Sequence, residues 1–222
     1  MDRPMLKSLF LSYHRRRFAW LFFTLLLTLG IYPALKPLAA GLNLMELLLA
    51  VNLLAAIASL APERHIRVLL WLGIAFVGVR GIQALFGIGG MRGVSEALWA
   101  TASLLATTAT ARHALRPGVV DAERIFAALD AYLLAGLVFG VWYWVLEQIS
   151  PGSFATASAG ALDLSRALYF SFVTIATLGY GDIVPASEPA RGVAILEAVG
   201  GQMYLAVLVA RLVSLYGREA DK

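Results

Sequence analysis

The sequence predicts an all-α membrane protein with six transmembrane helices, one shorter re-entrant helix and an irregular loop after it. Of its 222 residues, 60% are hydrophobic and only 14% are charged, and the mean hydropathy is +0.77. Soluble domains are far more polar than this. Six apolar stretches are long enough to cross the hydrocarbon core of a bilayer, which takes about 20 residues in a helix. A seventh stretch is too short to cross, so we expect it to enter the membrane and stop.

Short breaks that contain proline, glycine or charged residues separate the six predicted spans. The first span follows a basic segment that ends at Arg17, and we interpret it as a retained signal anchor. A cleaved signal peptide is the alternative, because LAAG at residues 38–41 resembles a weak cleavage site. The predicted spans are residues 18–35, 38–61, 66–88, 94–111, 124–149 and 189–216.

The distribution of Lys and Arg predicts how these spans are oriented. Thirteen of the 18 basic residues fall on one side of the predicted membrane, four fall on the other, and Arg80 lies within the third span. Because basic residues concentrate in cytoplasmic loops, both termini are predicted to be cytoplasmic. The net charge of +4 is explained by this topology, so a membrane lipid partner is predicted and a nucleic-acid partner is not.

The connection between the fifth and sixth spans, residues 150–188, is longer than the others and contains the seventh apolar stretch. Its first part, residues 150–162, is small, polar and predicted to be flexible. Asp163 is predicted to cap a helix over residues 164–176, because its carboxylate can accept hydrogen bonds from free amides of the first turn. Non-helical backbone at membrane depth is tolerated only inside protein or beside a water-filled cavity. TLGYGD at residues 177–182 is therefore predicted to be the return segment of a re-entrant loop.

The residues of TLGYGD suit the binding of a dehydrated cation, which needs oxygens in place of its water shell. Glycine reaches the backbone conformations that aim successive carbonyls the same way, which gives Gly179 and Gly181 a reason. Thr177 adds carbonyl and hydroxyl oxygens, and Tyr180 adds a carbonyl while its ring packs outward against the preceding helix. Asp182 is expected at the external mouth, and the negative end of that helix dipole favours a cation nearby.

Residues 174–182, TIATLGYGD, resemble the selectivity filter of potassium channels, and the likeness extends over residues 128–216 to the two-helix pore module of bacterial members. The resemblance implies that K⁺ is bound as the permeant ion, that no cofactor is needed, and that Thr174 and Tyr169 support the filter. It also implies a homotetramer, because one filter segment cannot encircle an ion. The filter residues expected to bind K⁺ are Thr177, Leu178, Gly179, Tyr180 and Gly181.

The sequence departs from the family pattern in two ways. Leu178 stands where the family usually has valine, which leaves the carbonyl ligand but requires room for a larger side chain. Val173 and Ala176 occupy positions where some relatives carry glutamate and threonine, so a carboxyl pair with Asp182 is not available. We therefore expect Tyr169 to be the partner of Asp182.

The resemblance divides the chain into four parts, with a topology like that of voltage-gated channels. The parts are a basic N-terminus (1–17), a four-helix sensor-like domain (18–115), a pore domain (120–217) and a short tail (218–222). A voltage sensor requires a ladder of arginines on the fourth helix, and residues 94–111 contain no Lys or Arg. The domain is therefore predicted not to sense voltage. Arg80 is predicted to form a structural ion pair with Glu46 or Glu96, with a sensing role as the alternative.

Several features have two interpretations from the sequence. Gly200 and Gly201 are either a gate hinge or a site of close helix packing. Asp130 and Arg211 are either a packing salt bridge or a gate latch. His14, His65 and His113 are predicted at solvated helix ends, with pH sensing as the alternative.

The predicted function is passive potassium conduction by a homotetramer in a prokaryotic plasma membrane. A weakly selective cation channel is one alternative, since Leu178 changes the filter. A potassium-binding subunit of a transport or sensory complex that does not conduct is the other. No enzyme is predicted, because the sequence has no Gly-rich phosphate loop, no HExxH and no nucleophile elbow. Cysteine is absent, which excludes disulfides and thiolate metal sites, and no cytosolic ligand-binding domain is expected in this chain.

Overall fold

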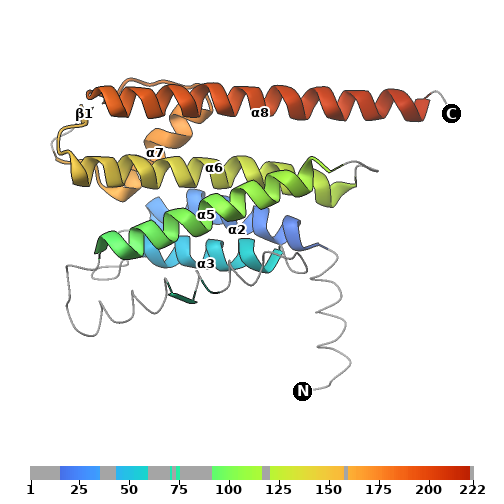
Figure 1. The fold of residues 1–222 in the computed structure, drawn as a ribbon, viewed down its shortest axis with the longest axis horizontal. Coiled ribbons are helices and arrows are strands. Elements are labelled where there is room, and N and C mark those ends of the chain that lie inside the picture. Colours follow the sequence, from blue (N-terminus) through green and yellow to red (C-terminus); the bar gives the residue numbers. More distant parts are fainter. Residues whose placement is uncertain are drawn as a thin grey trace, which may run out of the picture. The chain divides into compact units, whose positions relative to one another are not determined.

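The computed structural model describes residues 16–35, 44–59, 71, 74–75, 92–116, 121–157 and 160–220. The chain divides into two compact units, residues 1–131 and 132–222, and the boundary falls inside one long helix. Figure 1 shows the elements of both units, which are described separately below.

The first unit contains α2 (Arg17–Leu35), α3 (Leu44–Ser59), α5 (Arg92–Ala114) and the first turns of α6 (Ala122–Ile149). α2 and α3 bury leucines between them, among them Leu25 and Leu53. A polar bond crosses this interface, since Asn52 Nδ2 donates to Thr28 Oγ1 over 2.7 Å. Such a bond between two apolar helices fixes their register, because an unpaired amide would be costly there.

The first turns of α6 belong to the first unit and contact α2. The Phe18 amide donates to Glu123 Oε2 over 3.0 Å, which satisfies a free amide at the beginning of α2. The rings of Phe22 and Phe126 lie 5.5 Å apart. The compact unit that holds α7 and α8 begins at Tyr132, and a pore domain over residues 120–217 stays a prediction.

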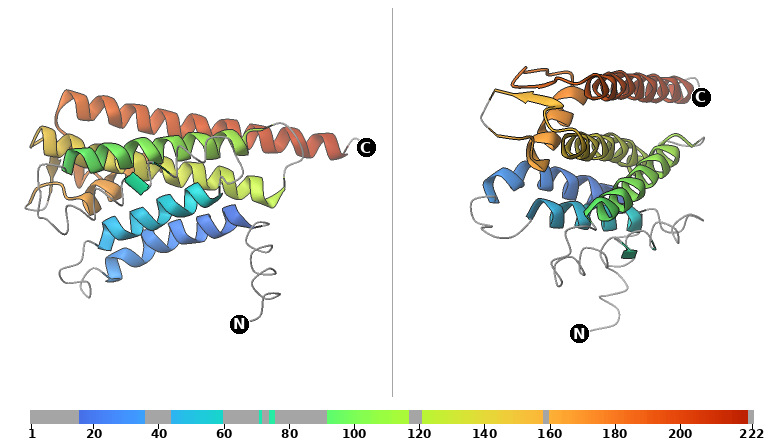
Figure 2. Two further views of the ribbon diagram at one scale, coloured as in Figure 1. Left: turned by 60° about the horizontal axis from the view of Figure 1, so that its bottom comes forward. Right: turned by 60° about the vertical axis from the view of Figure 1, so that its left-hand side comes forward.

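The second unit contains the rest of α6, β1 (Phe154–Thr156), α7 (Leu164–Ile175), β2 (Ile183–Pro185) and α8 (Glu188–Ala220). The short helix α7 packs against both α6 and α8, as the views of Figure 2 show. Three aromatic rings form the centre of the core of this unit. The ring centre of Tyr143 lies 4.9 Å from that of Phe170 and 5.4 Å from that of Phe154, in edge-to-face arrangements. Such pairs contribute about 0.5–1.5 kcal/mol beyond their buried area.

The prediction that residues 150–162 are flexible, in a chain without strands, was wrong for part of this segment. β1 pairs antiparallel with β2, with Phe154 opposite Pro185 and Thr156 opposite Ile183. Phe154 is buried in the ring cluster, and the Glu147 carboxylate accepts from the amides of Gly152 and Phe154 over 2.9 and 3.1 Å. The strand depends on partners about 30 residues away, so local composition did not indicate it.

Two helices of the described chain are long and apolar enough to cross a membrane by length and composition. They are the 28 residues of α6 and the first 27 residues of α8, residues 188–214. Three other predicted spans coincide with helices, namely α2, α3 and α5, but six spans stay a prediction. Most of the span at 66–88 lies outside the described residues, as do Arg80, His14, His65 and the side chains of Glu46 and Glu96.

Candidate ion-binding loop

α7 brings the TLGYGD loop to its position. Asp163 caps the helix with an extended backbone, and its carboxylate accepts from the Arg166 amide over 2.8 Å, which confirms the predicted start. The helix has 12 residues. At about 1.5 Å per residue it is roughly 18 Å long, well short of the ~30 Å hydrocarbon core. It can therefore enter a membrane but cannot cross one.

Glycines on the two long helices let them approach α7 closely. A Cβ on Gly136 would lie 2.8 Å from the Phe172 ring, and a Cβ on Gly140 would lie 2.6 Å from Leu168 Cδ2. On the other side, a Cβ on Gly201 would lie 2.6 Å from Ile175 Cγ1. Real Cβ atoms do not tolerate such distances, so α7 is held between α6 and α8 by contacts that only glycine permits.

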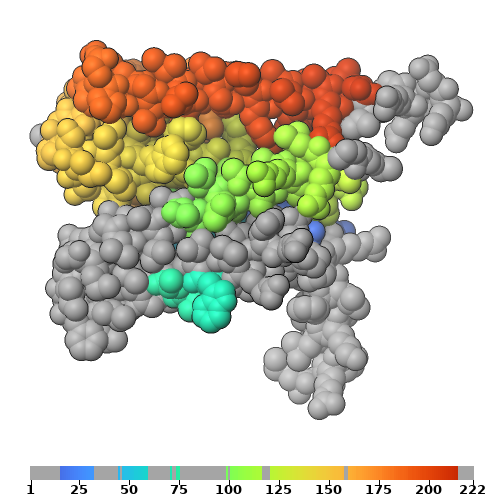
Figure 3. Space-filling model, viewed as in Figure 1, coloured from blue at the N-terminus to red at the C-terminus, as the bar shows by residue number. Residues whose placement is uncertain are grey.

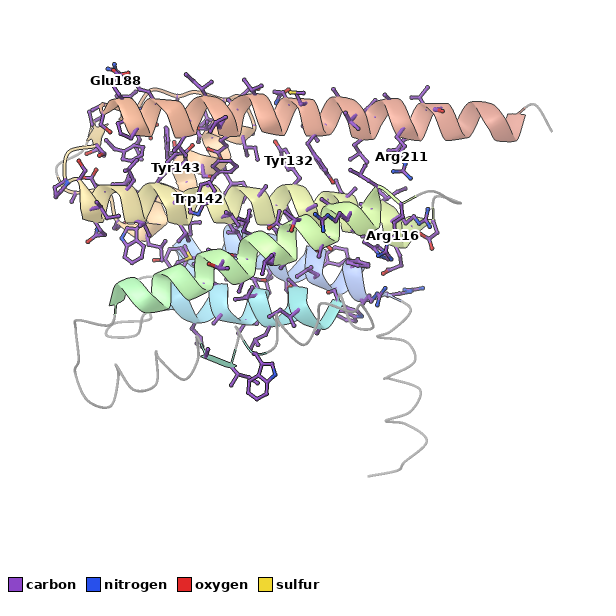
Figure 4. The ribbon with its side chains drawn as sticks, viewed as in Figure 1. Arg116, Tyr132, Trp142, Tyr143, Glu188 and Arg211 are labelled. Carbon is purple, nitrogen blue, oxygen red and sulfur yellow. The ribbon has the colours of Figure 1, made fainter. Side chains whose placement is uncertain are left out.

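The last carbonyl of α7 is bonded from both long helices. The Tyr132 hydroxyl on α6 donates to the Ile175 carbonyl over 2.9 Å, and Gln202 Nε2 on α8 donates to the same oxygen over 3.4 Å. Figure 4 labels Tyr132, whose ring also stacks on Tyr204 of α8 at 6.5 Å. Carbonyls at helix ends lack a partner in the helix, so these donors fix the point at which the loop starts.

Every second residue of the loop has a left-handed backbone. φ is 59° at Thr177, 57° at Gly179 and 79° at Gly181. In an ordinary strand, neighbouring residues face opposite sides, whereas alternation of left-handed and ordinary residues allows successive carbonyls to face the same side. Thr177 is β-branched, for which a positive φ is a marked outlier. Strain of this kind persists where the surrounding structure enforces it.

The first three amides of the loop are bonded to the end of α7. Thr177 N donates to the Thr174 carbonyl over 2.9 Å, and the amides of Leu178 and Gly179 donate to the Val173 carbonyl over 2.9 and 3.4 Å. Within the described part of the chain, no backbone amide donates to the carbonyls of residues 177–181. The first three loop amides are thus bonded to α7, while the loop carbonyls are left for a ligand that carbonyl oxygens can coordinate, such as a cation.

The side chains of the loop are largely exposed in a single chain. Leu178 is 55% exposed and Tyr180 is 65% exposed. The expected packing of the Tyr180 ring against the preceding helix therefore stays a prediction. The Tyr169 hydroxyl bonds to the Asp182 carboxylate, as expected. This hydrogen bond is the main reason that the pKa of Tyr169 lies above its ordinary value. This bond connects α7 with the residue after the loop.

The remaining predicted residues lie away from the loop or have a packing role. α8 is helical through Gly200, beside which a Cβ would have open space, while Gly201 packs on Ile175. This favours close packing for Gly201, and the hinge stays a prediction. Asp130 is fully buried, and neither carboxylate oxygen has a hydrogen-bond partner within the described residues. Its pairing with Arg211 also stays a prediction, and the His113 ring packs 4.8 Å from Phe18.

Sequence reasoning missed the polar residues behind α7. Glu197 is fully buried on α8, where it bonds to Tyr143 and Ser171, and the two donors to Ile175 were also overlooked. One clue was available, because a glutamate in the middle of an apolar membrane helix is costly and usually has a partner. The partners themselves lie 26 and 54 residues away in the sequence.

Comparison with known proteins places this geometry in context. Residues 127–218, which contain most of α6, α7, the loop and α8, match a family model described as "Ion channel". This segment resembles an ion-channel domain. No solved structure matches the chain significantly.

The curated relatives of the channel domain are potassium channels from plants and a bacterium. Two pore potassium channel c of Oryza sativa subsp. japonica is 35% identical over 83 residues, which is 37% of this chain and 18% of that protein. Inward rectifier potassium channel Kirbac3.1 of Paramagnetospirillum magnetotacticum is 32% identical over 91 residues, which is 39% of this chain and 28% of that protein. Two-pore potassium channel 1 of Arabidopsis thaliana is 35% identical over 89 residues, which is 40% of this chain and 22% of that protein. The chain thus spans less than a third of each relative, and the matches support a potassium-channel pore module.

Proposed function

We propose that the chain is the subunit of a potassium-selective channel that conducts K⁺ passively through the membrane. The observation that carries this proposal is the loop backbone, with left-handed φ at residues 177, 179 and 181 and carbonyls that receive no backbone amide. In this role the carbonyls of residues 177–181 replace the hydration shell of K⁺. Asp182 attracts cations at the outer mouth, and Tyr169 holds it in place.

The channel is a homotetramer in this proposal. One loop supplies one row of oxygens, and a ring around an ion requires several copies. The apolar part of α8 supports assembly, because only 11% of its most apolar 18 residues are buried in one chain. The side of α8 seen in Figure 3 is uncovered, and the exposed residues include Leu196, Val199, Met203 and Val207. Copies of the chain would cover part of this surface, and the rest would face lipid or the cavity.

The location and gating follow from the same proposal. Six helices per subunit, both termini in the cytoplasm and an inner membrane are inferred from the apolar stretches and the basic residues. The fourth predicted helix lacks the charges that couple to voltage. The first four helices therefore serve as a support or partner domain rather than as a voltage sensor.

Flux through liposomes that contain only the purified full chain tests the function. We expect K⁺ uptake that barium blocks, and a reversal potential in planar bilayers that follows the K⁺ gradient. A reversal potential that follows Na⁺ equally would instead identify the weakly selective channel. Potassium binding without flux would identify the subunit that does not conduct, and absence of both would overturn the assignment of the loop.

A further inference from the structure

Glu197 is at the centre of a hydrogen-bonded group that joins all three helices around the loop. Its side chain is fully buried within α8. Oε2 accepts from the Tyr143 hydroxyl of α6 over 2.5 Å, and Oε1 lies 2.5 Å from Ser171 Oγ of α7. Ser171 Oγ also lies 2.6 Å from the Gly136 carbonyl of α6. Figure 4 shows Tyr143 on the side of α6 that faces α8.

The number of protons in this group determines the charge of Glu197. The Gly136 carbonyl can only accept, and Ser171 has one hydroxyl proton for its two short contacts. If Glu197 were ionised, the single Ser171 proton could lie either toward Glu197 or toward the Gly136 carbonyl. In the contact that it leaves, two oxygen atoms would stand about 2.6 Å apart with no hydrogen between them. A protonated carboxyl removes this conflict, because it donates to Ser171, Ser171 donates to Gly136, and Tyr143 donates to the second carboxyl oxygen. Three protons then make three bonds.

The surroundings agree with a neutral carboxyl. No ion pair between Glu197 and a basic side chain occurs among the described residues, and its hydrogen-bond partners are hydroxyls. An ionised carboxylate inside a membrane helix is costly without a cation or several donors.

The group also lies close to the start of the loop. Ser171 is one turn before Ile175, whose carbonyl is bonded from α6 and α8. Movement of α7 relative to α8 would change the position of Val173 and Thr174, which accept the loop amides. A rigid bond at Ser171 therefore holds the loop carbonyls in place.

We propose that Glu197 is a positioning residue that carries its proton, and that the neutral chain Tyr143–Glu197–Ser171–Gly136 fixes α7, and with it the ion-binding loop, between α6 and α8. The effect on conduction rests on the proposed channel function. The protonation state and the bonding pattern do not.

The test compares two substitutions of Glu197 in the full-length protein reconstituted in liposomes. Glu197→Gln is neutral and keeps one donor for Ser171 and one acceptor for Tyr143, so K⁺ flux is expected within about twofold of the natural protein. Glu197→Ala leaves the buried Tyr143 hydroxyl without its partner and removes one of the two bonds of Ser171. K⁺ flux is expected to fall about tenfold or more, and the increase in melting temperature on adding K⁺ is expected to shrink. Tyr143→Phe removes one bond with little change of volume and is expected to give an intermediate loss.

An infrared difference spectrum reports the proton independently of conduction. The natural protein minus Glu197→Gln is expected to show the carbonyl stretch of a protonated carboxyl. Glu188→Gln is the matched control, because Glu188 lies on the same helix, is exposed and pairs with Arg191 over 2.7 Å. This control is expected to behave like the natural protein in flux.

Two results would overturn the inference. One is a carboxylate band instead of the protonated carbonyl band, and the other is a Glu197→Gln protein as impaired as a Tyr143→Phe or Glu197→Ala protein. If the natural protein shows the protonated band but no K⁺ flux, the proposed function fails while the protonated chain stands. A Glu197→Ala protein that does not fold leaves the decision to the spectrum and to Glu197→Gln.

Discussion

At the scale of single residues, the loop backbone depends on where each amide is bonded. Thr177 keeps a φ of 59° because its amide is bonded to Thr174 and the next two amides are bonded to Val173. A glycine at 177 would adopt this conformation without strain but would lack the hydroxyl. At positions 179 and 181 no side-chain oxygen is needed as a ligand, and the chain has glycine there, which adopts a positive φ without strain. Backbone conformation, together with the ligand chemistry of the proposed function, thus accounts for the residue type at these positions.

Gly179→Ala is predicted to abolish K⁺ flux in liposomes. Alanine in a left-handed conformation costs about 1–2 kcal/mol at each of the subunits, so the loop is expected to rearrange. Gly192→Ala is the control, because Gly192 is an exposed helical glycine with open space around it and no positive φ. Equal K⁺ flux in both variants would contradict the role of the Gly179 backbone.

Tyr169→Phe is predicted to destabilise the loop without removing it. The change deletes the hydroxyl that is bonded to Asp182 and leaves the ring in place. A hydrogen bond to a charged group contributes about 1.5–3 kcal/mol, less where both partners are exposed, as here. Faster loss of current during sustained opening is the expected measurement, and currents identical to those of the natural protein would count against this role.

At the scale of elements, α7 is a short helix held by tight backbone contacts and by buried polar bonds. Gly136, Gly140 and Gly201 allow the contacts, and Ser171 provides the bonds. Both are needed because a helix of 12 residues has little stability of its own. The position of the loop is therefore set by α6 and α8 rather than by the loop itself.

Gly201→Ala is predicted to destabilise the protein, whereas Gly200→Ala is not. The first change places a Cβ 2.6 Å from Ile175 Cγ1 and is expected to cost about 1–3 kcal/mol of folding stability. The second enters open space in a helix and is expected to gain up to about 1 kcal/mol. Thermal unfolding in detergent measures both. If Gly200→Ala instead alters open probability at unchanged stability, the hinge interpretation applies to Gly200.

At the scale of the whole molecule, the main feature is the apolar surface left exposed on α8. Of the most apolar 18 residues of this helix only 11% are buried, and in the proposed channel lipid and further copies of the chain cover the rest. The aromatic core beside it is closed within one chain. In the proposed channel, assembly would therefore add to a folded unit rather than create it.

The assembled protein is predicted to be a tetramer without steep voltage dependence. Native mass spectrometry is expected to give four copies of the 23.9 kDa chain. Planar-bilayer currents are expected to change with voltage only as the driving force does, because residues 94–111 carry no Lys or Arg. A dimer or trimer, or an exponential rise of open probability with voltage, would contradict this prediction.

The elements that local chemistry determines were predictable from the sequence. Asp163 marked the start of α7, and the glycines after Thr177 marked a loop of unusual backbone. Features that need a distant partner were not predictable. β1 exists because β2 lies opposite it, and Glu197 is tolerated because Tyr143 and Ser171 reach it.

The shared bonding of the Ile175 carbonyl has a mechanical consequence. One oxygen receives a hydroxyl from α6 and an amide from α8, two residues before the first left-handed residue of the loop. If the two long helices slide past each other, that atom cannot follow both, and one bond must lengthen. Displacement at the far ends of these helices would then be transmitted to the TLGYGD loop through a single peptide group.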